Sequence, residues 1–128
     1  MSMELERTGI VLYTLEYNRC VTFYRDILKL PLLFSTGELT CFGFGDAYLM
    51  VEKDDEYFMD HEDRGRIRFC LRLNVPDVKT MVENLRGHQI SVDLQEHSWG
   101  TVAKFCDPDG NLCAFRDSKS FEEQVMED

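Results

Sequence analysis

The sequence lacks a long apolar run, a CxxC cysteine pair and a stripe of basic residues. A membrane-spanning helix needs roughly 18 or more consecutive apolar residues, so we expect no membrane association. Without a CxxC pair, a structural zinc site is not expected either. The formal net charge of -10 would repel a phosphate backbone, which argues against nucleic acid as a partner.

The cysteines give no sign of a disulfide framework. There are 5 of them, an odd number, and they are widely spaced along the chain. This usage fits reduced thiols in a cytosolic protein better than disulfides. Residues 1–7 carry two glutamates and show no basic-then-apolar signal for secretion. We therefore expect a cytoplasmic protein.

The composition is that of one ordinary folded domain. The chain has 128 residues, of which 44% are hydrophobic and 12% aromatic. A chain of this length can bury a single core, so we predict one domain over residues 1–128.

The first part of the chain predicts a strand, a helix and three further strands. Residues 9–14 are β-branched and apolar, and Asn18 offers an N-cap for a following helix. Three extended runs follow Pro31, at residues 32–36, 39–44 and 47–53. The helix places one apolar stripe toward the core, formed by Cys20, Phe23, Tyr24, Ile27 and Leu28.

The same order of elements then repeats. After an acidic connector at residues 54–64, residues 66–75 alternate as a half-buried strand does. A helix follows, and Gly87 is predicted to end it as a left-handed C-cap. Extended runs at 90–94, 101–106 and 111–116 complete the repeat, before an acidic tail at 118–128 that could be helical or frayed. The apolar stripe of this helix consists of Val78, Met81, Val82 and Leu85.

The repeat predicts an α+β fold built from two βαβββ modules, residues 8–53 and 65–117. The modules should form a curved mixed sheet with the helices on its convex face. A module alone would leave one sheet face uncovered, because its single helix protects only the opposite face.

Two segments carry a resemblance to a known family. The turn Asp107–Asn111, of sequence DPDGN, lies before the last predicted strand, and the string FYRDIL at residues 23–28 lies in the first helix. By itself the turn is explained as a hairpin. Together the segments resemble the glyoxalase/bleomycin-resistance/extradiol-dioxygenase superfamily, the vicinal oxygen chelate fold, over about residues 8–117. The resemblance is closest to small metal-independent members of the bleomycin-resistance type.

The resemblance also implies where a metal ion would be held. Metal-using members place a ligand on the first and last strand of each half, and here these positions are Gly9, Cys70 and Ala114, with Glu52 or Val51 as the fourth. One carboxylate and one thiol do not make the expected divalent site. We expect no cofactor, and a divalent metal is the alternative.

The histidines do not repair this donor set. His61 lies in the acidic connector and His88 just beyond the second helix, so both are expected in solvent. His97, beside Trp99, could reach the mouth of a pocket. If a metal binds at all, its ligands would be Glu52 and His97.

The inner face of the sheet offers a second kind of site, a cavity for a small organic molecule. The alternative is that Arg72, Lys104 and Arg116 are solvated on an open face and paired with Glu52 or Asp117. Residues of the opposite parity, Phe69, Leu71, Phe105 and Phe115, should be core. The residues predicted to bind the ligand are Tyr13, Tyr48, Met50, Glu52, Cys70, Arg72, Trp99 and Arg116.

These observations favour a protein that binds or sequesters a small molecule, and the resemblance implies a homodimer with pockets shared between chains. The acidic charge favours a cationic ligand and the two inner arginines an anionic one, so no ligand is named. One alternative is a metal-dependent lyase, thiol transferase or dioxygenase, and another is a non-catalytic interaction module. Cys70 could also be a nucleophile, because Arg68 and Arg72 favour the thiolate.

Overall fold

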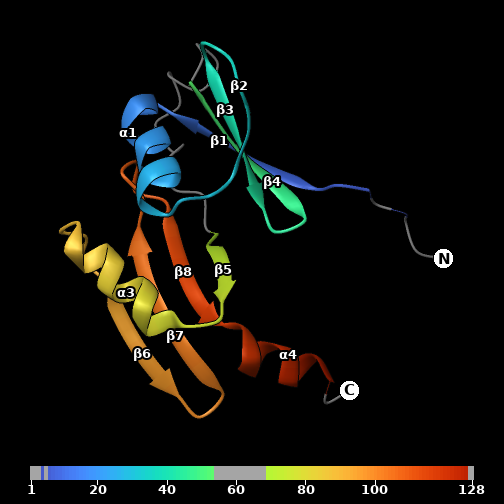
Figure 1. The fold of residues 1–128 in the computed structure, drawn as a ribbon, viewed down its shortest axis with the longest axis vertical. Helices are drawn as coiled ribbons and strands as arrows, with labels where there is room; N and C mark the ends of the chain where they lie inside the picture. Colours follow the sequence, from blue (N-terminus) through green and yellow to red (C-terminus); the bar gives the residue numbers. More distant parts are fainter. Residues whose placement is uncertain (1–3, 5, 54–68, 127–128) are drawn as a thin grey trace. The chain divides into compact units, whose positions relative to one another are not determined.

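In a computed structural model, which describes residues 4, 6–53 and 69–126, the chain divides into two compact units, Met1–Arg64 and Gly65–Asp128. Each unit contains one four-stranded mixed sheet (Figure 1). The first unit contains β1 (Gly9–Thr14), α1 (Tyr17–Thr22), the π-helix η1 (Phe23–Ile27), β2 (Leu32–Ser35), β3 (Leu39–Phe44) and β4 (Ala47–Lys53). The second contains β5 (Leu71–Val75), α3 (Val78–Gly87), β6 (Asp93–His97), β7 (Gly100–Cys106), β8 (Leu112–Asp117) and α4 (Ser118–Met126).

The two sheets have the same topology, which confirms the predicted pair of βαβββ modules. Their strand orders are β1-β4-β3-β2 and β5-β8-β7-β6. In each sheet the first and last strands of the module are parallel, and the other pairs are antiparallel. None of the helices in the described part of the chain is long and apolar enough to cross a membrane.

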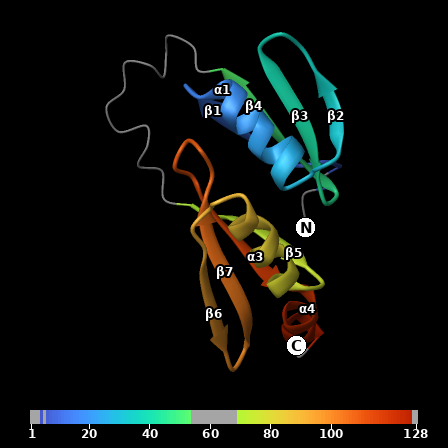
Figure 2. The ribbon, with the colours of Figure 1, turned by 60° about the vertical axis from the view of Figure 1, so that its left-hand side comes forward.

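In the first unit, α1 and η1 cover one face of the sheet (Figure 2). Tyr24 is fully buried there and meets Phe23 edge-on, with ring centroids 5.2 Å apart, and Phe42 at 6.3 Å. The apolar stripe predicted for this helix therefore faces the core, although Ile27 and Leu28 at its end are only half-buried.

The start of this helix differs from the prediction. Asn18 lies inside α1, whose N-cap position is Glu16, and no side chain caps it there. Instead the Thr14 hydroxyl accepts a hydrogen bond from the Glu16 N–H at 2.8 Å. Asn18 was wrongly predicted as the cap because a threonine on the preceding strand turns the chain two residues earlier. The helix ends before Pro31, as predicted, with Lys29 at a positive φ of 59°.

In the second unit, α3 lies against β7 and β8. Its cap is Asp77, whose carboxylate accepts from the N–H of Thr80 at 3.3 Å and from the Thr80 hydroxyl at 2.8 Å. Phe105 and Phe115 form the opposing layer, with centroids 5.0 Å apart. Phe105, Phe115 and Leu71 are buried as predicted, whereas Phe69 is only half-buried.

The end of α3 corrects two further predictions. Gly87 still belongs to the helix, and the left-handed residue is Gln89, with φ of 61°. The Ile90 N–H donates to the Leu85 carbonyl at 3.1 Å, so Ile90 completes the helix end, and β6 begins only at Asp93. The strand predicted at 66–75 is a strand from Leu71 onward, while residues 66–68 and the connector at 54–64 lie outside the described residues.

The acidic tail is helical over Ser118–Met126, where α4 continues directly from β8 (Figures 1 and 2). Asp117 precedes it and accepts a hydrogen bond from the Ser120 N–H at 2.8 Å, which is the geometry of an N-cap. No residue of α4 is buried. The helix is therefore attached to the second unit mainly by polar contacts rather than by a packed core face.

Candidate functional site

The face of the first sheet opposite its helix collects four of the residues predicted to bind a ligand. Alternation buries Leu12, Thr14, Leu49 and Val51 on the helix side. On the other side the register pairs Val11 with Met50 and Tyr13 with Glu52, and Tyr48 is two residues before Met50. Tyr13 is 40% exposed, and Tyr48, Met50 and Glu52 are half-buried. The face is thus an aromatic and thioether wall that ends in one carboxylate.

Tyr48 also occupies the space at the first predicted metal position. A Cβ added at Gly9 would lie 2.1 Å from Tyr48 Cζ, so the phenol ring lies directly over the glycine. The one carboxylate of this unit in the predicted set, Glu52, pairs with Tyr13, four residues along β1 from Gly9. Four residues of a strand span roughly 13 Å, too far for both positions to contact one ion.

The metal position predicted on β8 offers no ligand atom. Ala114 is buried and pairs with Arg72 on β5. Within residues 4, 6–53 and 69–126, no three His, Cys, Asp or Glu side chains lie close enough together to hold a metal ion. The donors in the described part of the chain therefore do not fit the divalent ion that enzymes of this superfamily use.

The residues predicted in the second unit have different surroundings. Arg72 is exposed on β5, whereas Arg116, on the same sheet face, is only 4% exposed. Cys70 is half-buried, and its thiol donates to the Leu71 carbonyl at 3.7 Å. A backbone carbonyl cannot take the thiol proton, so this contact does not support a nucleophilic role for Cys70.

Arg116 and Trp99 form a cluster between the β6–β7 turn and α4. The guanidinium carbon lies 4.7 Å from the Trp99 ring centroid and 5.6 Å from that of Phe121. Its Nη2 donates to the Trp99 carbonyl at 3.2 Å, to Ser120 Oγ at 3.2 Å and to Gln124 Oε1 at 3.0 Å. Nε donates to Ser120 Oγ as well, at 3.3 Å. The structure thus brings two predicted ligand residues together under a helix that sequence reasoning had treated as a tail.

His97, the second residue of the alternative metal pair, belongs to the same end of the unit. Its imidazole stacks on Trp99 with centroids 4.5 Å apart and rings 6° from parallel. Nε2 lies 3.0 Å from Gln95 Oε1. Both contacts orient the imidazole along the β6–β7 hairpin.

Asp117, beside Arg116, serves the backbone instead of the guanidinium. Its carboxylate accepts from the N–H groups of Thr101 and Ser120, both at 2.8 Å, and from the Ser120 hydroxyl at 2.7 Å. These hydrogen bonds lower the pKa of Asp117 to about 2. In the alternative in which the inner arginines are paired with Asp117 or Glu52, the Arg116 charge does lower the pKa of Asp117, but the hydrogen bonds of this carboxylate go to Thr101 and Ser120.

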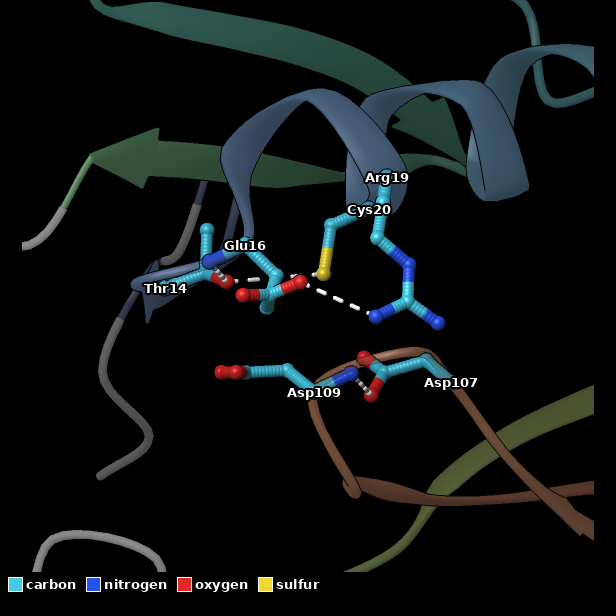
Figure 3. A network of polar contacts seen from close by, with 6 residues as sticks. All are labelled: Thr14, Glu16, Arg19, Cys20, Asp107 and Asp109. Carbon is cyan, nitrogen blue, oxygen red and sulfur yellow. Dashed lines mark hydrogen bonds and ion pairs between the residues drawn. The ribbon is translucent and has the colours of Figure 1, made fainter.

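A polar cleft of about 440 Å³ in the first unit was missed by sequence reasoning. It lies where β1 runs into α1, and Lys53 Nζ stands 5.5 Å from the Tyr17 ring centroid at its wall. Figure 3 shows its hydrogen bonds: Thr14 Oγ1 lies 3.5 Å from the Cys20 thiol, and Arg19 Nη1 donates to Glu16 Oε1 at 3.0 Å. No motif marks these residues in the sequence. The lining residues are Thr14, Leu15, Glu16, Tyr17, Asn18, Arg19 and Lys53.

A more apolar cleft of about 500 Å³ in the second unit was missed as well. It brings the exposed Lys104 and Cys106 beside the chain that leads into β6. The strand predicted at residues 90–94 begins three residues before β6 does, so residues 90–92 were expected in a strand and not at the wall of a cleft. The lining residues are Ile90, Ser91, Val92, Asp93, Lys104, Phe105, Cys106 and Leu112.

The DPDGN turn has the structural role that its chemistry predicts. The Asp107 carboxylate accepts from the N–H groups of Asp109 at 2.9 Å (Figure 3) and Asn111 at 2.8 Å, and from the Asn111 side-chain amide at 2.8 Å. Gly110 takes a positive φ of 89°. The turn is therefore a hairpin closed by its first aspartate, as predicted.

Paired βαβββ modules with helices on one face of each sheet define the vicinal oxygen chelate class of fold. The model of the glyoxalase-like domain family matches residues 8–126. The chain therefore belongs to the glyoxalase-like family, within the glyoxalase/bleomycin-resistance superfamily that the sequence resembles. A search of curated proteins found no match.

Solved structures share the fold at low sequence identity. Lactoylglutathione lyase from Agrobacterium tumefaciens is 19% identical, with 88% of this chain and 92% of that chain covered and a TM-score of 0.67. TnmS3, an antibiotic-binding protein from Streptomyces sp. CB03234, is 20% identical, with 91% and 98% covered and a TM-score of 0.72. A glyoxalase/bleomycin resistance protein from the same organism is 20% identical, with 87% and 99% covered and a TM-score of 0.69. An enzyme and a binding protein thus share this fold, so the fold does not decide between the two functions.

Proposed function

We propose that this protein binds a small organic molecule without a metal ion, and that the ligand lies on the open face of β1 and β4. The observation that carries the proposal is the pairing of Tyr13 with Glu52 beside Tyr48 and Met50. Aromatic rings and a thioether offer apolar area, and one carboxylate fixes orientation, which is the usual composition of a small-molecule site.

The donor set supports binding without a metal. Gly9 and Ala114 provide no ligand atom, and the Tyr48 ring fills the space over Gly9. A protein of the same fold is described as antibiotic-binding, so antibiotics are the first class of probe.

The test is a thermal-shift screen of the whole protein with aromatic antibiotics, followed by calorimetric titration of each compound that raises the melting temperature. We expect at least one such compound, with binding weakened about tenfold or more in Tyr13→Ala and in Glu52→Gln. Glu38→Gln is the matched control, because Glu38 is an exposed carboxylate in the same unit. Equal affinity in all three variants would overturn the placement of the site.

Metal analysis of the purified protein tests the other half of the proposal. We expect no stoichiometric ion in the wild type. An ion present at one per chain and lost in Glu52→Gln would instead favour the metal-dependent lyase alternative.

We also propose that the protein is a homodimer, as the family resemblance implies. Size-exclusion chromatography with light scattering should give twice the chain mass of 15.0 kDa. A monomer at micromolar concentration would refute the dimer without touching the proposed ligand face.

A further inference from the structure

Arg116 is a buried cation that makes all of its hydrogen bonds to neutral groups. Its side chain is among the few charged groups in the core of the described chain, and every acceptor of its hydrogen bonds is neutral. No ion pair of Arg116 occurs among residues 4, 6–53 and 69–126. The neighbouring carboxylate, Asp117, accepts its hydrogen bonds from two backbone N–H groups and the Ser120 hydroxyl, so it interacts with Arg116 through charge but without a hydrogen bond. A desolvated guanidinium normally has a carboxylate or phosphate partner, because neutral dipoles compensate its charge less well.

The cover over Arg116 is weakly attached. Ser120, Phe121 and Gln124 contact the guanidinium from α4, yet no residue of that helix is buried. Phe121 is 36% exposed, and Val125 on the next turn is 56% exposed. A helix held by a few hydrogen bonds and little apolar burial opens at low free-energy cost.

We propose that Arg116 and Trp99 form an anion site for a small carboxylate, and that α4 covers this site until the carboxylate displaces the Gln124 side chain. The guanidinium fork can donate two parallel hydrogen bonds to a carboxylate, where it now donates to an amide and a hydroxyl oxygen. The Trp99 ring, 4.7 Å from the guanidinium carbon, forms an apolar wall beside those donors. The proposal goes beyond the small-molecule face proposed above, because all of its residues lie in the second unit.

Trp99 makes the proposal directly measurable, because it is the single tryptophan of the sequence. The probe is sodium benzoate, titrated into the full-length protein at constant ionic strength against chloride, with excitation beyond the benzoate absorption. Benzamide is the neutral control of the same shape. We expect a saturable change in Trp99 fluorescence with benzoate and none with benzamide.

Variants separate a covered site from a purely structural arginine. Gln124→Ala removes one neutral hydrogen bond between Arg116 and α4. The benzoate concentration that gives half of the full fluorescence change should therefore fall about fivefold. Arg116→Gln should abolish the benzoate response, and Arg116→Lys should weaken it, since an ammonium keeps the charge but not the fork. Arg86→Gln is the matched control, because Arg86 is an exposed guanidinium on α3 of the same unit. It should respond like the wild type.

Hydrogen exchange provides the second readout. Benzoate should accelerate amide exchange over residues 118–126, because the carboxylate displaces the cover, whereas a structural arginine would leave that rate unchanged. Circular dichroism establishes that each variant is folded, and Gln124→Ala and Arg116→Lys keep the test valid if Arg116→Gln does not fold. The absence of a saturable response in both the wild type and Gln124→Ala, or an equal response in folded Arg116→Gln, would overturn the proposal. If no ligand binds at Tyr13 and Glu52, the function proposed above fails, but the anion site at Arg116 is unaffected.

Discussion

The ring of Tyr48 lies over Gly9, its partner on the neighbouring parallel strand, so closely that no side chain fits between the ring and the β1 backbone. A glycine in a strand ordinarily weakens the sheet, because it offers nothing to pack. Here the aromatic side chain of the partner strand covers the gap. The pair therefore joins two features that the sequence presents separately, a missing metal ligand and an aromatic of the proposed ligand face.

Gly9→Ala should destabilise the protein by about 1–3 kcal/mol, because the new methyl group forces the Tyr48 ring away. Urea unfolding gives the free energy directly. In a double-mutant cycle with Tyr48→Ala the two changes should be clearly non-additive, because the alanine at position 48 removes the ring that the methyl group meets. Additive free energies would mean that the ring does not lie over Gly9.

Gly100→Ala should lower stability more than Gly110→Ala. Both glycines have positive φ, 153° and 89°, but a Cβ at Gly100 would also lie 2.3 Å from Ser120 Oγ, whereas nothing lies within 4 Å of one at Gly110. The backbone conformation alone costs about 1–2 kcal/mol, and the clash should add about 1 kcal/mol or more. Unfolding curves of the two variants test the difference. Equal losses would show that α4 does not approach Gly100.

Asp117→Asn should weaken the attachment of α4 and lower stability at pH 7 by about 1–2 kcal/mol, because an amide has one accepting oxygen where both carboxylate oxygens accept from backbone N–H groups. The pKa of Asp117 falls from 3.8 to about 2 on folding, so the native state binds fewer protons than the unfolded chain. The stabilisation is complete above the unfolded pKa and is lost as the pH falls from about 4 to about 2.

The wild-type advantage over Asp117→Asn should therefore shrink across that acidic range, which denaturant titrations at successive pH values measure. Glu122→Gln, an exposed carboxylate on the same helix, serves as the control and should leave the pH dependence nearly unchanged. A difference that stays constant down to pH 2 would contradict the hydrogen-bonded role of Asp117.

The cysteines should react in three groups with a thiol reagent. Cys106 is exposed and should react first, Cys70 is half-buried and should follow, and the other three are buried and should react only on unfolding. Burial also raises the pKa of the Cys41 thiol, which slows its reaction further. Mass spectrometry of timed labelling assigns each site, and fast labelling of Cys41 in the native protein would contradict this core.

Features that depend on one short segment of the sequence were predicted correctly. The stripe containing Phe23 and Tyr24 faces the core, and the DPDGN turn closes a hairpin through Asp107. Helix ends were predicted less well. Asn18 and Gly87 have the right residue types for caps, but Thr14 and Gln89 set those ends, because the backbone takes the hydrogen bond or the left-handed conformation that the surrounding packing allows.

The sequence by itself determined the order of the elements, the face of each strand and the residue types at the positions where the resemblance places metal ligands, since periodicity and residue type are local properties. Only the tertiary structure decided what those side chains meet. It paired Tyr13 with Glu52, laid Tyr48 over Gly9 and brought α4 onto Arg116. Such contacts join residues from separate strands and helices, so their geometry depends on strand register and helix packing, which no single segment encodes.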